Sequence, residues 1–254
     1  IDYSGSAVNK QNFLNVLLGD DSNGPALKSD ENSKVFVYFV DHGGAGLICT
    51  PQGSSDWIYA DELDYTLQQM SDKKMFKELT FYLEACESGS MFPNLTDKEN
   101  IYAITASNAT QSSWGAYCGS EATIDGTSIG SCLGDLFSIN WMEDTDAAIQ
   151  SKSMDSETLS TQYDTVKTET TRSPVLKFGD FSFNNEAIGE FEGVVEASSD
   201  DLWIQSWLNR GVALFDAEPQ RASAEHVDQR DHMLHYLSNK VMTEGGDENH
   251  AALL

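Results

Sequence analysis

The chain has 254 residues, of which 40% are hydrophobic and 10% aromatic, enough for one α/β domain with a sizeable core and a short appendage. Its formal net charge of -26 opposes binding to phosphate backbones and anionic lipid surfaces, so we expect neither nucleic acid nor a membrane as a partner. No apolar run approaches the ~18 residues that suggest a membrane span.

The first half of the chain alternates predicted helices and strands. Residues 8–18 have apolar side chains at helical spacing, and residues 19–34 are polar enough for a loop. The continuous apolar run 35–40 is typical of a strand that is buried on both faces of a parallel sheet. A helix and two strands are expected next, at 61–75, 79–83 and 101–105. This order predicts an α/β fold with a mainly parallel sheet flanked by helices.

The second half is less regular. Residues 107–134 are rich in Ser, Gly, Thr and Asn, which predicts a long surface loop. A helix is expected around 154–167, and residues 179–196 are expected to be irregular or strand-like. The domain should close near Phe215, and the apolar spacing within 223–241 predicts a last helix.

Two residues that carry chemistry each follow the end of a predicted parallel strand. His42 and Cys86 should therefore gather at the carboxyl edge of the sheet, where active sites of open α/β folds lie. Taken singly, such a Cys is more often a small buried hydrophobe and such a His a core residue. Together, a His followed about 50 residues later by Cys in a Glu-Ala-Cys context is the caspase-type arrangement of base and nucleophile. We expect the N–H groups of Gly43 and Cys86 to form an oxyanion hole.

Several short segments resemble one known family. They are Asp41–Gly44, Glu84–Met91, Ala106–Asn108, Ser112–Gly115, Cys132–Leu136 and Trp141–Asp144. These segments are similar to those of the legumains, also called asparaginyl endopeptidases or vacuolar processing enzymes, and look closest to the plant and vacuolar branch. The resemblance runs from Asp2 to about Lys177.

The resemblance implies a caspase-like fold and a cysteine-type endopeptidase that cleaves proteins and peptides after Asn, less readily after Asp, with a secondary transpeptidase or ligase activity. Catalysis would fall on Cys86 and His42, with no cofactor and no metal. Glu84, Ser113 and Asp135 match residues that line the specificity pocket of the family. The chemistry fits, because carboxylates accept both N–H groups of a side-chain amide.

The resemblance also implies how the chain is divided. Residues 1–215 would form the peptidase domain, without the amino-terminal part that carries two sheet strands, an Asn that orients the catalytic His and an Arg that grips the substrate. Residues 216–254 would be a linker and the start of a helical activation segment. We therefore expect a zymogen truncated at both ends, whose partner is its own carboxyl-terminal prodomain. The apolar residues of 227–241 are expected to pack against other prodomain helices rather than the sheet.

Cys118 and Cys132 resemble a pair that is disulfide-bonded in plant-type members, and Cys49 is expected to be a core residue. Asn94 and Asn108 begin glycosylation acceptor triplets, which matter only in the secretory pathway. With the family resemblance, they indicate a glycoprotein of the vacuole or lysosome.

Two alternatives remain open. The catalytic subunit of a glycosylphosphatidylinositol transamidase belongs to the same superfamily, but its Cys region reads Asp-Thr-Cys-Gln-Ala, unlike Glu84–Glu87. A catalytically silent relative that serves as a binding or regulatory module would not need both His42 and Cys86. The missing amino-terminal Asn keeps this second alternative open.

Overall fold

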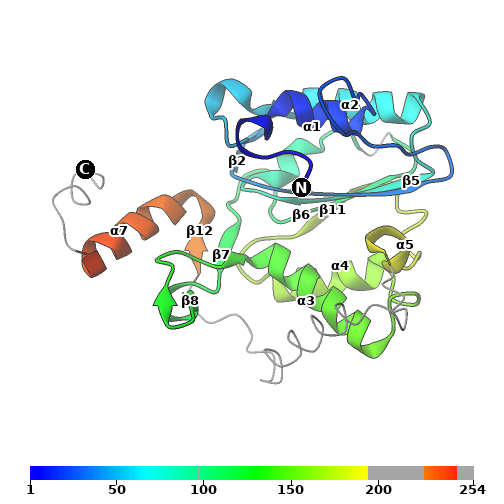
Figure 1. Cartoon of the computed structure of the whole chain (residues 1–254). Coiled ribbons are helices and arrows are strands. Elements are labelled where there is room, and N and C mark those ends of the chain that lie inside the picture. Colours follow the sequence, from blue (N-terminus) through cyan, green and yellow to red (C-terminus); the bar gives the residue numbers. More distant parts are fainter. Residues whose placement is uncertain (96–97, 194–225, 245–254) are drawn as a thin grey trace, which may run out of the picture.

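A four-stranded sheet forms the centre of the molecule (Figure 1). The computed structural model describes residues 1–95, 98–193 and 226–244. In spatial order the sheet contains β1 (Lys34–Val40), β5 (Glu78–Glu84), β6 (Ile101–Thr105) and β11 (Leu176–Gly179). The first three strands are parallel, and β11 runs antiparallel to β6. The predicted α/β fold with a mainly parallel sheet is confirmed.

Helices cover both faces of this sheet (Figure 1). One face carries α1 (Lys10–Leu17) and α2 (Ala60–Asp72). The opposite face carries α3 (Leu136–Ser151), α4 (Leu159–Glu169) and the short α5 (Gly189–Glu192). Each face has its own cluster of buried apolar side chains, so the sheet is buried on both sides.

Strand alternation on β5 decides what reaches each face. Leu79, Phe81 and Leu83 belong to the core cluster beneath α1 and α2, whereas Tyr82 belongs to the cluster beneath α3 and α4. The last residue of the strand, Glu84, points to the same face as Tyr82, where its carboxylate accepts the backbone N–H of Ser138 in α3. A carboxylate at the carboxyl end of the strand is thereby carried toward the α3 side.

Smaller elements surround the carboxyl edge of the sheet. One minor sheet contains β2 (Gly43–Gly44), β3 (Leu47–Ile48) and β4 (Ile58–Tyr59). A second contains β7 (Trp114–Ala116), β10 (Gly134–Asp135) and β12 (Val227–Asp228). A third pairs β8 (Thr123–Ile124) with β9 (Thr127–Ser128). Short 3-10 turns lie at Gly5–Ala7, Ser54–Asp56, Ser88–Met91, Gly119–Glu121 and Gln229–Asp231. The last described helix is α7 (His232–Glu244).

The structure corrects the predicted long loop. Residues 107–134 contain β7, which is the middle strand of its minor sheet, and Ala116 and Cys118 within this segment are buried. The sequence also gave no sign of α3, because its buried face includes Ser138 and Asn140. These polar residues interrupt the apolar stripe, and they are satisfied by tertiary partners, Glu84 and Thr170.

Residues 179–196 were expected to be irregular or strand-like, and their described part is mostly turns, with Gly179 at the end of β11, an isolated bridge at Ala187 and the short helix α5. Two further boundaries were wrong. The helix predicted around 154–167 is α4, which starts only at Leu159 because Thr158 caps it, its side chain accepting the N–H of Thr161. The last helix, expected over 223–241, begins at His232, and the residues just before it form β12. The boundary expected near Phe215 lies outside the described residues.

The described helices include none that is both long and apolar enough to cross a membrane.

Candidate active site

Parallel pairing of β1 with β5 brings the two predicted catalytic loops together. Val40 pairs with Glu84, and the N–H of Asp41 donates to the Glu84 carbonyl at 3.3 Å. His42 and Cys86 therefore each lie two residues beyond paired positions. A Cβ at Gly43 would lie 2.4 Å from the Cys86 carbonyl oxygen, so a glycine is required where the two loops touch.

The β2–β3 hairpin supports the His42 loop. The Cys49 N–H donates to the His42 carbonyl at 2.8 Å, and the His42 N–H donates to Asp41 Oδ1 at 2.6 Å. Burial raises the pKa of Cys49, with smaller contributions from Asp41 and Cys86. The His42 ring is exposed, and within the described residues no hydrogen bond joins it to Cys86.

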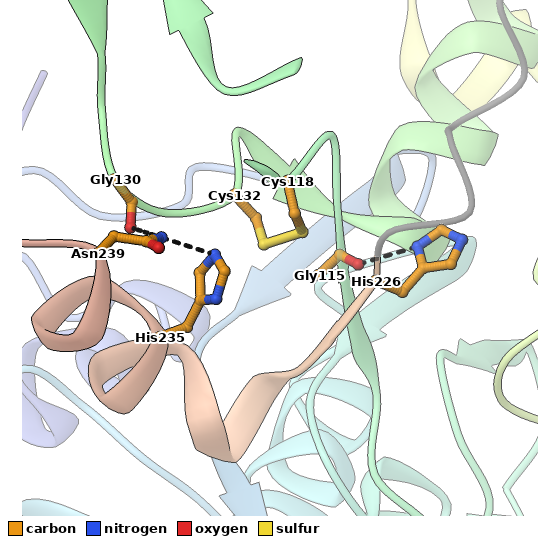
Figure 2. The surroundings of a disulfide bond; sticks show 7 residues. All are labelled: Gly115, Cys118, Gly130, Cys132, His226, His235 and Asn239. Atoms are coloured by element: carbon orange, nitrogen blue, oxygen red, sulfur yellow. Dashed lines mark hydrogen bonds between the residues drawn. A yellow bond between two sulfur atoms is a disulfide. The ribbon is translucent and has the colours of Figure 1, made fainter. Parts of the chain in front are cut away.

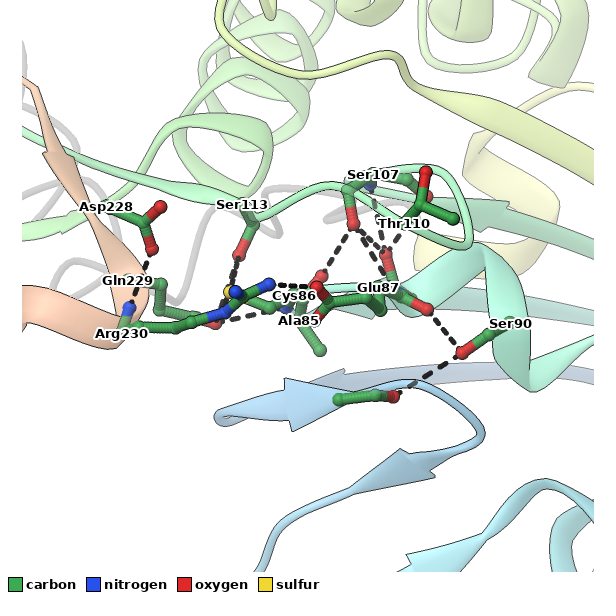
Figure 3. Close-up of polar contacts among 12 residues, drawn as sticks. Ala85, Cys86, Glu87, Ser90, Ser107, Thr110, Ser113, Asp228, Gln229 and Arg230 are labelled. Atoms are coloured by element: carbon green, nitrogen blue, oxygen red, sulfur yellow. Dashed lines mark hydrogen bonds and ion pairs between the residues drawn. The ribbon is translucent and has the colours of Figure 1, made fainter.

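Cys86 is fully buried beneath a side chain from a distant part of the chain (Figure 3). The Gln229 amide oxygen accepts the Cys86 backbone N–H at 3.2 Å and lies 3.5 Å from Cys86 Sγ. The same oxygen accepts the Ser113 hydroxyl at 3.0 Å. A primary amide thus occupies the space between the expected nucleophile and the expected pocket.

The segment that carries Gln229 enters the site as an added β-strand. Val227 pairs with Gly115 and Asp228 with Trp114, both antiparallel on β7. The Gln229 N–H then continues the ladder by donating to the Ser113 carbonyl at 3.1 Å. Extended peptides commonly bind sheet edges in this way, with the main chain giving affinity and side chains entering pockets.

An ion pair flanks this contact. The Arg230 guanidinium binds the carboxylate of Glu87, the residue that follows Cys86 (Figure 3). Glu87 is 9% exposed, and its second oxygen has no hydrogen-bond partner among the described residues. Glu87 also has φ 49°, the left-handed region, which non-glycine residues occupy only where the surroundings hold them.

The three expected pocket residues converge in the structure. Ser113 contacts Gln229, and Glu84 accepts the backbone N–H and hydroxyl of Ser138 at 2.9 and 3.0 Å. Burial and the nearby Asp135 carboxylate raise the pKa of Glu84 well above its usual range. Burial also raises the pKa of Asp135 to about 6, although hydrogen bonding with Gln229 and the charge of His42 lower it. Both carboxyl groups are therefore easier to protonate than free side chains.

A disulfide joins Cys118 and Cys132, the pairing that the resemblance implied, and α7 docks beside it (Figure 2). The Asn239 side chain donates to the Gly130 carbonyl at 2.9 Å, and a ring nitrogen of His226 lies 3.1 Å from the Gly115 carbonyl. Burial lowers the pKa of His232, with further lowering by His42 and His235. The last histidine, His250, lies outside the described residues.

Sequence reasoning missed the roles of Gln229, Arg230 and Glu87. It treated residues 223–241 as one helix, although the Asp228 side chain accepts the Arg230 N–H at 3.0 Å and caps a separate turn. An Asp at this position was the available signal, because Asp favours caps over helix interiors. Glu87 carried no signal, since its partner is distant in sequence.

The sequence profile of the Peptidase C13 family matches residues 1–194. The vacuolar-processing enzyme delta-isozyme of Arabidopsis thaliana is 46% identical over 172 residues, which cover 65% of this chain and 36% of that protein. A vacuolar-processing enzyme of Vicia sativa is 35% identical over 263 residues, covering 99% of this chain and 51% of that protein. Legumain of Mus musculus is 38% identical over 207 residues, which cover 79% of this chain and 44% of that protein. The chain spans only about a third to a half of these relatives.

Proposed function

The chain belongs to the Peptidase C13 family, and we propose that it is the peptidase part of a cysteine endopeptidase that cleaves peptide bonds after Asn and, less readily, after Asp. The observation that carries this proposal is the Gln229 side chain, a primary amide bound among Cys86, Ser113 and Asp135. An Asn side chain carries the same amide group, one methylene shorter.

In the proposed mechanism, the Cys86 thiolate attacks the carbonyl carbon of the Asn residue. His42 takes the thiol proton and returns it to the leaving amine, and the N–H groups of Cys86 and Gly43 stabilise the oxyanion. Water hydrolyses the resulting acyl-enzyme, whereas attack by a peptide amine gives transpeptidation.

The pocket chemistry supports selectivity for amides. An ionised Asp135 accepts N–H groups from Asn, and the Ser113 hydroxyl donates to its carbonyl oxygen. The ionised carboxylate also repels the side chain of an Asp substrate. Glu84 lies behind this pair and, when protonated, adds no second negative charge.

The protein is proposed to be made as a zymogen. With Gln229 bound at Cys86 and β12 paired on β7, residues 227–230 fill the place that a substrate would take. The apolar residues Met233 and Leu234 of α7 are 66% and 53% exposed, which fits the expectation that this helix packs against a further part of the prodomain.

We also propose that the protein works in the vacuole or lysosome after transit through the secretory pathway. The two plant relatives are named as vacuolar proteins. Asn94 is exposed, and Asn108 is partly exposed with its side chain accepting the N–H of Thr110 at 2.9 Å, so both are candidates for glycosylation. Thr96, the third residue of the first triplet, lies outside the described residues.

The decisive experiment is cleavage of a quenched Asn-containing peptide by the full-length, acid-activated protein. Cys86→Ala should reduce kcat/KM by at least about a thousandfold, because it removes the nucleophile and only one buried sulfur. Circular dichroism should find the variant folded.

Cys49→Ala is the matched control, since Cys49 is the second free thiol and lies beside the His42 loop. We expect it to keep activity within a few-fold. The proposal would be contradicted if Cys86→Ala kept most of the activity. It would also be contradicted if the peptide were cleaved equally well after Asn was replaced by Leu.

A further inference from the structure

We propose that Glu87 forms an acidic subsite that selects a Lys or Arg immediately after the cleaved bond. This inference rests on the proposed function, but it concerns the leaving side of the substrate rather than the Asn pocket. Nothing in the preference for Asn requires it.

The register of the bound segment on β7 resembles that of an extended substrate. Val227 and Asp228 pair with β7, the Gln229 N–H reaches the Ser113 carbonyl, and the Gln229 side chain enters the amide pocket. Gln229 therefore stands where the residue before the cleaved bond would stand. Arg230, the next residue, consequently stands where the first residue of the leaving peptide would stand.

Arg230 contacts an acidic side chain. Arg230 binds the Glu87 carboxylate directly, and Glu87 adjoins the nucleophile in the chain. The Glu87 side chain is 12% exposed even though Arg230 itself is 51% exposed, so the acceptor is sheltered while the approaching cation can arrive from solvent. Its second oxygen is buried and lacks a hydrogen-bond partner within the described residues, so half of the acceptor capacity of this carboxylate is unused while Arg230 is bound.

The backbone of Glu87 is held by several hydrogen bonds. Its N–H donates to the Gln111 carbonyl at 2.9 Å, and its own carbonyl accepts the N–H and hydroxyl of Ser90 at 2.8 and 2.6 Å. The Ser90 hydroxyl oxygen in turn accepts the Gly46 N–H at 2.7 Å, which ties this turn to the β2–β3 hairpin. A fixed backbone limits the positions that the carboxylate can take, so less entropy is lost when a cation binds.

The test measures kcat/KM of the activated full-length protein on quenched peptides that differ only in the residue after Asn: Lys, Gln or Glu. We expect Lys to exceed Glu by about tenfold or more, and this ratio to shrink at 0.5 M NaCl as the charge pair is screened. Glu87→Gln should bring the Lys-to-Glu ratio near unity, and Glu87→Lys should invert it.

A general attraction of basic peptides to a chain of net charge -26 must be separated from this effect. Glu169→Gln, an exposed carboxylate at the end of α4, removes the same charge elsewhere and should leave the ratio unchanged. A peptide with its Lys moved four residues further along should lose most of the advantage in the unmodified protein.

A second measurement covers the case in which Glu87 variants fail to fold. Synthetic peptides of residues 224–236 are tested as inhibitors of the activated, unmodified protein, and Arg230→Glu in the peptide should weaken inhibition by about tenfold. Cleavage after Asn that depends on Cys86 but ignores the next residue, with equal inhibition by both peptides, would overturn the subsite and leave the proposed function standing. Absence of Asn cleavage would overturn both.

Discussion

Asp135 and Glu84 share one buried pocket, and burial favours the neutral form of both carboxyls. The pKa of Asp135 is raised to about 6 and that of Glu84 is raised well above its usual range, in both cases chiefly by burial. As pH falls through about 6, Asp135 becomes neutral. The pocket thus loses the negative charge of Asp135 as the solution becomes mildly acidic.

This charge change predicts a pH-dependent choice of substrate. Between pH 7 and pH 5, the Asn-to-Asp ratio of kcat/KM should fall by about tenfold, because neutral Asp135 no longer repels an Asp side chain whose own pKa is near 4. The ratio cancels pH effects on the catalytic step, because both substrates share that step. Parallel assays across this range on two peptides measure it.

Asp135→Asn removes the titrating group and should give a low, nearly flat ratio. Asp155→Asn, at an exposed position in the turn before α4, serves as the control and should keep the slope. A constant ratio in the unmodified protein would argue against Asp135 as the selective group.

At the level of elements, a carboxyl cluster joins the helices on the far side of the sheet. Asp144 of α3, Glu157 before α4 and Glu192 of α5 lie together. Thr145 donates to Glu192 at 2.7 Å and accepts the Gln162 amide at 3.0 Å. Burial, Glu157 and Glu169 raise the pKa of Asp144 to about 7, and burial with Glu157 raises that of Glu192 to about 7.

The sign of the resulting pH dependence follows from proton binding. Unfolded carboxyls have pKa values near 4, so between about pH 4 and pH 7 Asp144 and Glu192 bind more protons in the folded protein than in the unfolded chain. Their contribution to the free energy of unfolding should therefore fall as pH rises through this window and level off above it. The cluster makes the domain more stable in acid.

Asp144→Asn should raise the free energy of unfolding at pH 7.5 by about 1 kcal/mol and have little effect at pH 4.5, because it replaces a charge only where one exists. Urea denaturation of the Cys86→Ala background at both pH values measures this. Asp155→Asn is again the surface control. An equal effect at the two pH values would contradict the proton linkage.

At the scale of the whole molecule, the carboxyl-terminal segment closes the site by three contacts of different kinds. These are β12 on β7, the Gln229 amide at Cys86, and the Arg230–Glu87 ion pair (Figure 3). Asn239 of α7 adds a contact to the disulfide-bearing loop (Figure 2). These contacts are polar, and the one made by Gln229 is buried, since Gln229 is 3% exposed.

We predict that Gln229→Ala in the full-length precursor raises residual activity near neutral pH by about tenfold, since the variant loses hydrogen bonds worth about 1 kcal/mol each. The assay uses freshly purified precursor and a small Asn substrate before any acid exposure. Gln68→Ala, exposed on α2, should leave residual activity unchanged. An unchanged precursor in the Gln229 variant would mean that this amide does not restrain activity.

The sequence alone determined those features that depend on local patterns. The apolar runs around Val37, Phe81 and Ile104 predicted parallel strands buried on both faces. This is correct for β5 and β6, whereas β1, at the edge of the described sheet, is mostly half-buried and its Val40 is exposed. His42 and Cys86 could be paired because residues after parallel strands must meet at one sheet edge.

Only the tertiary structure decided the remaining features. α3 is a helix because Ser138 and Asn140 find partners in Glu84 and Thr170, and no local periodicity encodes those contacts. Residues 227–230 form a strand and a turn because the edge of β7 offers unpaired backbone groups, and only folding brings that edge near. The raised pKa values of Glu84 and Asp135 have the same origin, since burial and mutual repulsion exist only once two distant carboxylates occupy one pocket.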